Sequence, residues 1–229
     1  MSAVIDFHAH VLPAADHGSD GIDTTKLQLS LLKDAGVDRV VATPHFYPDR
    51  HTCEYFEEKI DRALNMLSSI ECDRPEICLG AEVLYCDGID RMDGLDRLCI
   101  KGTNVLLLEL PTNTWERSLF DTVRRLLKKY TVVLAHIDRY AHKQSDDIDE
   151  LLEMGALAQI NVSALYSFFA KRDIAHYIAN GSIVAIGSDL HGADKHASKH
   201  FAGAQKKLGD EYAEIMARTE KLLSGAQVI

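Results

Sequence analysis

The sequence predicts one α/β domain folded as a parallel barrel. Short apolar runs alternate with longer segments of helical periodicity along the whole chain, which is typical of consecutive βα units. The apolar runs are rich in β-branched residues and almost continuous in hydrophobicity, as strands covered on both faces are. No linker and no internal repeat interrupts them, so residues 1–229 are expected to form a single domain.

Seven strands and six helices are expected. The strands are expected at residues 3–7, 39–44, 76–81, 104–110, 131–136, 156–161 and 182–188. The helices are expected at residues 24–36, 54–70, 115–130, 146–155, 168–181 and 211–225. Because eight strands are the usual number in such barrels, either one strand is hidden or the barrel is incomplete.

The composition and charge of the chain indicate which classes of protein are not expected. The chain has 229 residues and a formal net charge of −10, so nucleic-acid binding is not expected. Its five cysteines are odd in number and form no CxxC pair, which indicates reduced thiols and a cytoplasmic protein. The first residues have neither the basic region nor the apolar run of a signal peptide, and we expect no membrane span.

Metal-binding residue types follow six of the seven expected strands. In a parallel barrel the carboxyl ends of the strands meet at one rim, where catalytic groups gather. The strand at 156–161 is the exception, since it ends in Asn161 and Ser163. The residues at the other strand ends are His8, His10, His45, Glu82, Glu109, His136, Asp189 and His191.

The spacing of these residues favours a shared metal site. Side chains two positions apart in an extended chain point to one face, so His8 and His10 can reach the same ion. Asp189 and His191 repeat this arrangement, and the loop after the first strand adds His17. One ion with an open position needs three or four protein ligands, so this larger set suits two or three ions.

Such a cluster points to phosphate chemistry. Three divalent ions would leave the rim positively charged despite the carboxylates of Glu82, Glu109 and Asp189. Metal ions lower the pKa of bound water and hold the attacking and leaving oxygens of a phosphoryl group. No cysteine lies beside these residues in a nucleophile loop, so a thiol-based phosphatase is not expected.

Taken together, the motifs resemble those of the PHP (polymerase and histidinol phosphatase) superfamily. The most similar branch is the bacterial tyrosine phosphatases of capsule and exopolysaccharide operons, the CpsB/CapC type. The motifs occur in order over residues 4–192: DFHAHVLPAADHG, ATPHFYP, GAEVLY, LLLELP, LAHIDRY and GSDLHG. The resemblance implies a distorted (β/α)7 TIM-like barrel of the PHP type.

The resemblance also implies an activity and a partner. The expected activity is a metal-dependent protein-tyrosine phosphatase, in which a metal-activated hydroxide attacks the phosphotyrosine of a protein. The implied substrate is a bacterial tyrosine kinase of a polysaccharide operon, and the implied role is regulation of capsule or exopolysaccharide synthesis. The oligomeric state is left open.

Three divalent metal ions are implied, with manganese as the first expectation and zinc or iron as alternatives. By matching motif positions, the first ion would be held by His8, His10, Glu82 and Asp189. The second would be held by Glu82, Glu109 and His136, and the third by residue 17, His45 and His191.

Substrate contacts follow from the same resemblance. Arg139 matches an arginine that contacts phosphate, and a guanidinium fork suits a pair of phosphate oxygens. A salt bridge at the rim is the alternative role for Arg139. His10 or Asp189 is expected to help protonate the phenolate. The segment 46–48 beside His45 either lines a pocket for the phenyl ring or packs as an ordinary loop.

Two positions depart from the family pattern. The family has two aspartates before the loop glycine, and the second is the ligand, whereas this chain has Asp16 followed by His17. Either His17 takes that role, which would favour zinc or iron over manganese, or Asp16 swings in. The second phosphate-binding arginine is replaced by His196, with Lys195 beside it. Either could contact phosphate, or both could belong to a solvated face with Lys199 and His200.

Three alternative functions stay open. The His17 departure motivates a phosphatase of a small phosphomonoester such as histidinol phosphate. A metal-dependent amidohydrolase is disfavoured, because that class commonly carries a bridging lysine after the fourth strand, where this chain has Glu109. A non-catalytic, metal-stabilised regulatory module is disfavoured by the complete ligand set.

Overall fold

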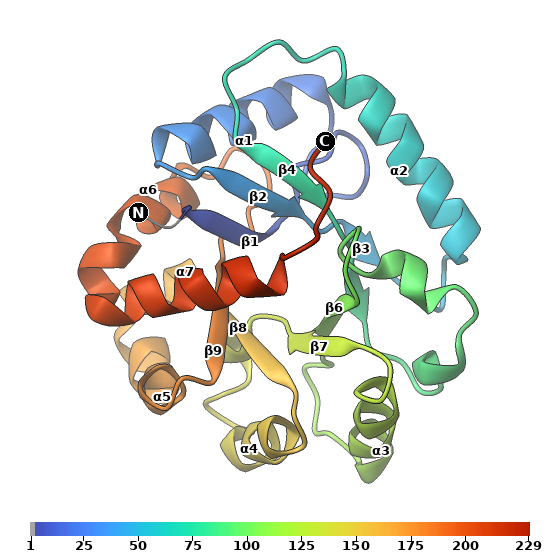
Figure 1. The fold of residues 1–229 in the computed structure, drawn as a ribbon, viewed down its shortest axis with the longest axis vertical. Helices are drawn as coiled ribbons and strands as arrows, with labels where there is room; N and C mark the ends of the chain where they lie inside the picture. The colour runs from blue at the N-terminus through green and yellow to red at the C-terminus, as the bar shows by residue number, and fades with distance from the viewer. Residues whose placement is uncertain (1–2) are drawn as a thin grey trace.

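The strands of the protein run parallel to one another, and helices surround them (Figure 1). A computed structural model describes residues 3–229. The strands are β1 (Ile5–Ala9), β2 (Arg39–Ala42), β3 (His45–Phe46), β4 (Glu76–Leu79), β5 (Glu82–Leu84), β6 (Val105–Glu109), β7 (Thr131–Leu134), β8 (Leu157–Asn161) and β9 (Ile183–Gly187). The helices are α1 (Ile22–Asp34), α2 (Cys53–Leu67), α3 (Arg117–Leu126), α4 (Ser145–Glu153), α5 (Phe168–Ala179), α6 (Lys195–Leu208) and α7 (Asp210–Leu222).

Two of the expected strands, 39–44 and 76–81, end two residues early, and each is followed by a short strand that was not expected. The order is β1-β2-β4 in one sheet and β3-β5-β6-β7-β8-β9 in the other. Pro44, which has no backbone N–H for a ladder hydrogen bond, lies between β2 and β3, and Gly80 lies between β4 and β5. Pairing nevertheless continues across the breaks: Gly80 N donates to Ala42 O at 2.9 Å, and Glu82 N donates to Pro44 O at 3.1 Å.

The first and last strands meet at their carboxyl ends. Asp189 N donates to His8 O at 2.7 Å, and His10 N donates to Leu190 O at 3.2 Å. Gly187 lies so close to β1 that an added Cβ would be 2.5 Å from the His8 Cβ, so only glycine permits this approach. The structure confirms the predicted α/β class with parallel strands. It brings the ends of β1 and β9 together.

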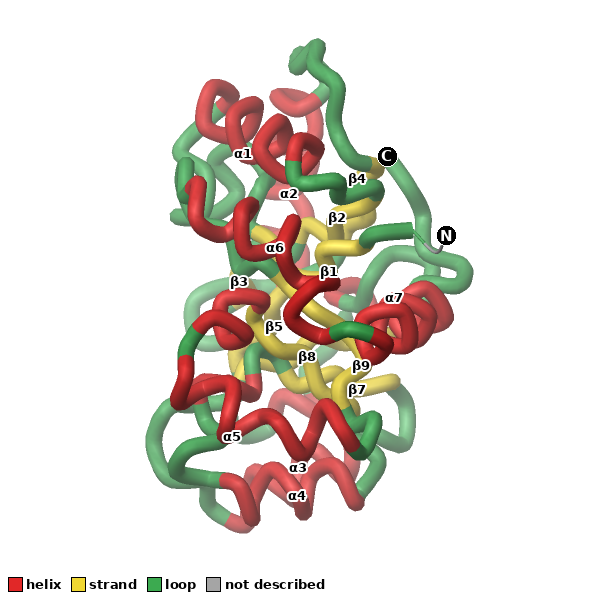
Figure 2. The backbone as a smooth tube through the Cα atoms, turned by 90° about the vertical axis from the view of Figure 1, so that its left-hand side faces the viewer, coloured by secondary structure: helices red, strands yellow, loops and turns green. Residues whose placement is uncertain are grey.

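The helices pack their apolar faces on the strands. Figure 2 shows the strands in the middle of the molecule, with α1 and α2 on one side and α3 and α4 on the opposite side. None of the helices formed by residues 3–229 combines the length and the apolar character needed to cross a membrane.

One helix, α6, was not predicted. Its charged first turn resembles a solvated face, but Asp194 caps it by accepting a hydrogen bond from His196 N at 2.7 Å. Phe201 and Ala204 on its other face are buried. The N-cap Asp194 followed by small and apolar residues at helical spacing is the signal that would have identified it.

Candidate metal centre

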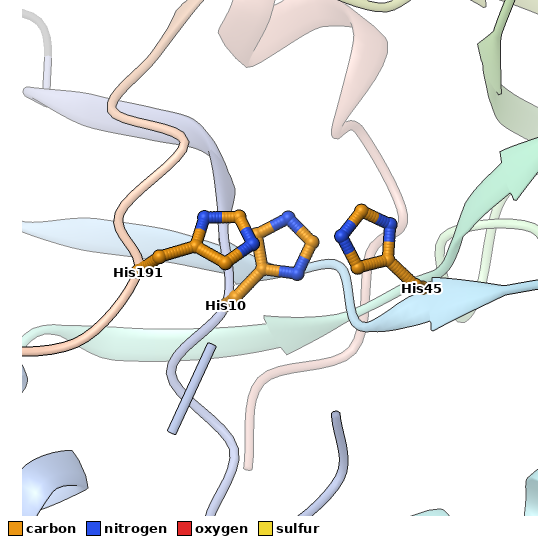
Figure 3. Close-up of side chains that lie close together, drawn as sticks. All are labelled: His10, His45 and His191. Atoms are coloured by element: carbon orange, nitrogen blue, oxygen red, sulfur yellow. The ribbon is translucent and has the colours of Figure 1, made fainter. Parts of the chain in front are cut away.

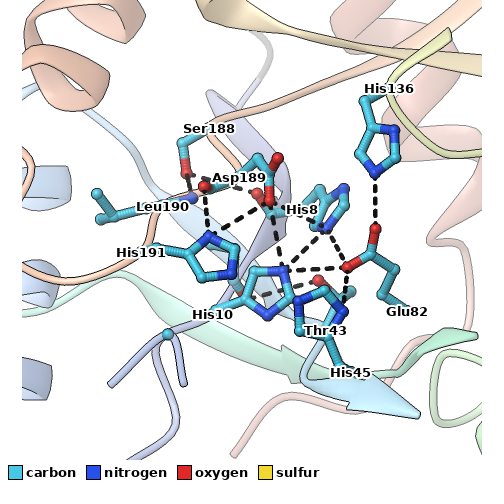
Figure 4. Close-up of polar contacts among 12 residues, drawn as sticks. His8, His10, Thr43, His45, Glu82, His136, Ser188, Asp189, Leu190 and His191 are labelled. Carbon is cyan, nitrogen blue, oxygen red and sulfur yellow. Dashed lines mark hydrogen bonds and ion pairs between the residues drawn. The ribbon is translucent and has the colours of Figure 1, made fainter. Parts of the chain in front are cut away.

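Glu82 lies at the centre of a buried cluster of histidines and carboxylates (Figure 4). Its Oε1 is 2.8 Å from His136 Nε2, and its Oε2 is 2.9 Å from His45 Nδ1. Oε2 is also 3.3 Å from the Nε2 atoms of both His8 and His10. Glu82 therefore faces four histidines with two oxygens, which is the arrangement of a carboxylate that bridges two ions.

The first group of ligand atoms comes from β1 and from the turn after β9. His8 Nε2 and His10 Nε2 are only 3.2 Å apart, so the two rings of this i, i+2 pair converge on one point. Asp189 Oδ1 lies 3.7 Å from His8 Nε2 and 3.4 Å from His10 Nε2. Together with Glu82, these residues surround a common point from several sides.

Hydrogen bonds on the far side of three histidines set their tautomers. His10 Nδ1 is 2.7 Å from Asp16 Oδ2, His8 Nδ1 is 3.3 Å from Gln159 Oε1, and His191 Nδ1 is 3.0 Å from the Asp189 carbonyl oxygen. Each partner is an acceptor, so Nδ1 carries the proton and Nε2 keeps its lone pair. This is the usual way in which metal-binding histidines are oriented.

A second group consists of histidines stacked at the rim. His10, His45 and His191 bring ring nitrogens within 4.8 Å of one another (Figure 3). The ring of His17 stacks on His45 at 4.8 Å between centroids and lies 4.7 Å from the ring of His191. His17 is the exposed member of this group, since it comes from the loop that covers the rim.

A third group lies on the other side of Glu82. Glu109, at the end of β6, brings a carboxylate oxygen within 4.8 Å of ligand atoms of His45 and Glu82. Its Oε1 is 3.7 Å from His136 Nε2. The structure thus brings the strand-end residues of the predicted ligand set into one cluster and places His17 beside it.

The chemistry of the cluster fits divalent cations. Within residues 3–229, His191 Nε2 is a buried atom with no hydrogen-bond partner, and His45 Nδ1 and Glu82 Oε2 lie 2.9 Å apart without the geometry of a hydrogen bond. Buried polar atoms without partners are costly, and lone pairs that converge on one place suit a cation. Imidazole nitrogens and carboxylate oxygens are the ligands of zinc, iron and manganese.

The cluster strongly perturbs its own ionisation. Burial alone would raise the pKa of Glu82, but His8, His10 and His136 outweigh it and hold that pKa well below its usual value. Burial would lower the pKa of His10, yet its contacts with Asp16 and Asp189 raise it well above the usual value. The metal-free site therefore holds protons on some histidines where cations would bind.

Two ligand positions have strained backbones. His136, two residues after the end of β7, has φ 32°, and Asp189, two residues after the end of β9, has φ 52°. A non-glycine residue in this left-handed region costs about 1–3 kcal/mol, and such residues are concentrated at functional sites. The strain turns both side chains toward the cluster rather than continuing the strands.

Arg139 closes the cluster on the side of an open cavity. Its guanidinium pairs with Asp189 Oδ2, and its Nη1 is 3.6 Å from Glu109 Oε1. The side chain is 43% exposed, so it also reaches solvent. A cavity of about 360 Å³ adjoins it, lined by residues of β8, the β9 turn and α6 that include Asn161, Ser163, His196 and His200.

The other residues that the sequence predicts to contact substrate lie in different surroundings in the structure. His196 lines this cavity with Arg139, whereas Lys195 is exposed at the start of α6 and is not among the lining residues. Phe46 is fully buried in the core and cannot line a substrate pocket. Tyr47 is half-buried and stacks on His45, with ring centroids 5.3 Å apart.

Sequence reasoning missed several supporting residues. Gln159 Oε1 accepts from His136 N at 2.6 Å as well as facing His8. Asn161 Nδ2 donates to Asp189 Oδ2 at 3.0 Å. Both lie on β8, which seemed to carry no functional residue. A polar Gln inside an otherwise apolar strand was the available signal, because such a residue needs buried partners.

Asp16 accepts hydrogen bonds from residues of the cluster and of its own loop. Its Oδ2 accepts from His45 N at 2.8 Å as well as from His10, and its Oδ1 accepts from Gly18 N at 2.8 Å. Burial would raise its pKa, but these hydrogen bonds and the His10 charge hold it well below the usual value. Asp16 therefore orients His10, while the ring of its neighbour His17 lies against the histidines of the second group.

Comparison with known proteins identifies the family. The sequence matches the family model for capsular polysaccharide synthesis proteins of the CpsB/CapC type over residues 4–223. The chain belongs to the CpsB/CapC family. The tyrosine-protein phosphatase YwqE of Bacillus subtilis (strain 168) is 26% identical over 242 residues, which cover 99% of this chain and 93% of YwqE. These matches confirm the resemblance inferred from the motifs.

Solved structures show the fold of this CpsB/CapC protein. A chain from the crystal structures of YwqE from Bacillus subtilis and CpsB from Streptococcus pneumoniae, described as metal-dependent tyrosine phosphatases, superposes with a TM-score of 0.81. It is 20% identical, and the match covers 99% of this chain and 96% of that one. Histidinol phosphate phosphatase from Lactococcus lactis, bound to zinc, L-histidinol and phosphate, has a TM-score of 0.57 at 14% identity, covering 90% and 94%.

Proposed function

We propose that this protein is a metal-dependent protein-tyrosine phosphatase. The observation that carries the proposal is the Glu82-centred cluster with Arg139 at its open side, in a member of the CpsB/CapC family. The curated relative YwqE is a tyrosine-protein phosphatase, which supports the same substrate class here.

The proposed centre holds three divalent ions. His8, His10, Glu82 and Asp189 would hold the first, Glu82, Glu109 and His136 the second, and His17, His45 and His191 the third. Manganese is proposed first, with zinc or iron as alternatives. Zinc and iron are favoured at the proposed site of the third ion, because its ligands His17, His45 and His191 are all imidazoles. Bound ions would lower the pKa of a water and withdraw charge from phosphoryl oxygens.

The residues of this chain would bind and orient the phosphate. Arg139 lies between the metal-binding carboxylates and the cavity, so its guanidinium can leave Asp189 and Glu109 for phosphoryl oxygens. A planar fork of N–H donors suits such a pair of oxygens. His196, which lines the same cavity, would supply a second donor in place of the arginine of the family pattern.

Proton donation to the leaving group needs little help from the protein. A phenol has a pKa of about 10, so phenolate leaves readily compared with an alkoxide. His10 and Asp189 remain proposed as groups that can assist. Asp189 is paired with Arg139, and His10 is held by Asp16, so both are better placed to bind cations than to donate protons.

The physiological setting is part of the proposal. The family description names capsular polysaccharide synthesis. The proposed role is regulation of capsule or exopolysaccharide synthesis, and the proposed substrate, implied by the motif resemblance, is a bacterial tyrosine kinase of a polysaccharide operon. A cytoplasmic location is proposed because all five cysteines are free thiols.

The test is phosphate release from phosphotyrosyl peptides by protein loaded with manganese, zinc or iron. Turnover above that of a Glu82→Gln variant is expected, and its absence with every metal would refute the proposal.

A phosphatase of a small phosphomonoester is the second candidate. His17 favours it, because that position departs from the tyrosine phosphatase pattern. Parallel measurement of kcat/KM on phosphotyrosyl peptides and on histidinol phosphate separates the two functions. A preference for the small substrate above about 100-fold, roughly 3 kcal/mol in the barrier, would replace the first proposal.

A further inference from the structure

Two phenylalanines stand exposed at the start of α5. Phe168 is 78% exposed and Phe169 is 67% exposed, and their rings meet edge-to-face with centroids 5.5 Å apart. They are the most exposed large hydrophobic side chains in the part of the chain that the structure describes. Single exposed apolar residues are ordinary, whereas contiguous exposed apolar surface is typical of interaction sites. Phe168 and Phe169 are called the aromatic pair below.

The aromatic pair is held in an ordered turn. The Ser167 side chain caps α5 by accepting a hydrogen bond from Ala170 N at 3.4 Å. The opposite face of the helix buries Ile174 and Tyr177 in the core. Because the helix is anchored on that side, the phenylalanines cannot turn inward without breaking its packing.

The aromatic pair adjoins the wall of the catalytic cavity. Asn161 and Ser163, which follow β8, line that cavity with Arg139. Tyr166 then stacks on His200, another lining residue, with ring centroids 4.1 Å apart, and its hydroxyl donates to the His200 carbonyl at 3.0 Å. The short segment from Ser163 to Phe168 therefore leads directly from the cavity to the aromatic pair.

Positive charge accompanies these rings. The Arg172 guanidinium carbon is 5.8 Å from the centroid of Phe169, and Lys207 Nζ is 4.7 Å from the centroid of Tyr166. Arg172 is paired with Asp173 at 2.9 Å, whereas Lys171 is exposed in the same turn. This local charge contrasts with the net charge of −10 of the chain. The surface thus suits a group that is apolar with an acidic neighbour, while the net negative charge disfavours an anionic membrane.

We propose that the aromatic pair binds the substrate polypeptide beside its phosphotyrosine, taking up an apolar side chain next to an acidic residue. This inference rests on the proposed phosphatase function and adds a sequence preference to it. The phosphotyrosine would occupy the cavity at Arg139 while the flanking residues lie across α5.

The test compares two phosphotyrosyl peptides, one with leucine and glutamate beside the phosphotyrosine and one with alanines there. The wild type is expected to favour the first by about tenfold in kcat/KM, which is about 1.4 kcal/mol. Phe168→Ala/Phe169→Ala should abolish this preference and leave hydrolysis of p-nitrophenyl phosphate unchanged. Leu27→Ala, which removes an exposed apolar side chain on α1, is the matched control and should keep the preference.

Binding provides a readout that does not depend on turnover. Fluorescence anisotropy of the first peptide with metal-stripped protein should show weaker binding by the double alanine variant and unchanged binding by Phe168→Tyr/Phe169→Tyr. Equal kcat/KM for both peptides in the wild type would overturn the inference. The inference would also be overturned if the double alanine variant lost binding to anionic vesicles, or lost self-association, while its peptide kinetics stayed the same as those of the wild type. Failure of the wild type to hydrolyse any phosphotyrosyl peptide would instead refute the proposed function.

Discussion

Replacing Asp16 with asparagine should weaken metal binding without removing an ion. Asp16 Oδ2 accepts hydrogen bonds from His10 Nδ1 and from His45 N, while Oδ1 accepts from Gly18 N. An asparagine of the same shape has only one oxygen. When the asparagine oxygen points toward Gly18, the asparagine NH₂ faces His10 Nδ1. This NH₂ donates to Nδ1 and so favours the His10 tautomer with its proton on Nε2. That tautomer has no Nε2 lone pair to bind a cation.

The opposite orientation of the amide is also unfavourable. It would place two donors, the asparagine NH₂ and Gly18 N–H, against each other, and an unsatisfied buried donor costs about 1–3 kcal/mol. Loss of a partner that orients a metal-binding histidine typically reduces metal affinity 10- to 100-fold. We therefore expect Asp16→Asn to raise the Kd of the first ion by roughly 10- to 100-fold, or about 1.4–2.7 kcal/mol.

The assay is calorimetric titration of metal-stripped protein, together with elemental analysis at saturation. Asp16→Asn should keep the saturating number of ions, whereas His17→Ala should lower it. Asp20→Asn, a change at an exposed position of the same loop, should behave as the wild type. If Asp16→Asn lowers the number of ions and His17→Ala does not, then Asp16 is the ligand and the reasoning from the hydrogen bonds is refuted.

Three further predictions concern the phosphate contact, the packing of β1 and the effect of pH. Arg139→Lys keeps the charge but loses the fork, so kcat/KM on a phosphotyrosyl peptide should fall roughly 10- to 100-fold with metal content unchanged; a wild-type rate would exclude the proposed contact. Gly187→Ala would place a Cβ 2.5 Å from the His8 Cβ and should destabilise the protein by about 1–3 kcal/mol in thermal unfolding. Gly21→Ala, which meets nothing within 4 Å, should not, and equal melting temperatures for the two variants would contradict the packing. The pKa values of His8 and His10 are raised above 6.5 in the metal-free protein, because nearby carboxylates outweigh burial. Cations need neutral imidazole, so metal affinity should fall as the pH drops from 8 to 6, and a constant Kd would contradict proton competition.

The strand-end residues were predictable because the barrel rule needs only the order of strands. A parallel arrangement brings the carboxyl ends to one rim, so His45, Glu82 and His136 are neighbours whatever the details of packing. The i, i+2 spacing of His8 and His10 likewise needs only an extended chain. These features depend on local periodicity, which the sequence carries directly.

The supporting contacts could not be predicted in the same way. The hydrogen bond between Asp16 and His10 depends on the path of a loop, which Gly18 sets by its close approach to His10. Gln159 reaches two histidines because β8 lies beside β7 in a particular register, shown by the pairing of Leu134 with Ala158. Such contacts join residues more than 100 positions apart in the case of His8 and Gln159, and periodicity contains no information about them.

The most direct test of the account is phosphate release from a phosphotyrosyl peptide as metal is returned to stripped protein. We predict no turnover without metal and turnover that rises with added manganese, zinc or iron until the cluster is filled. Full activity in the stripped protein, or a metal-loaded protein that releases no phosphate, would contradict the claim that the cluster around Glu82 is the catalytic centre of a tyrosine phosphatase.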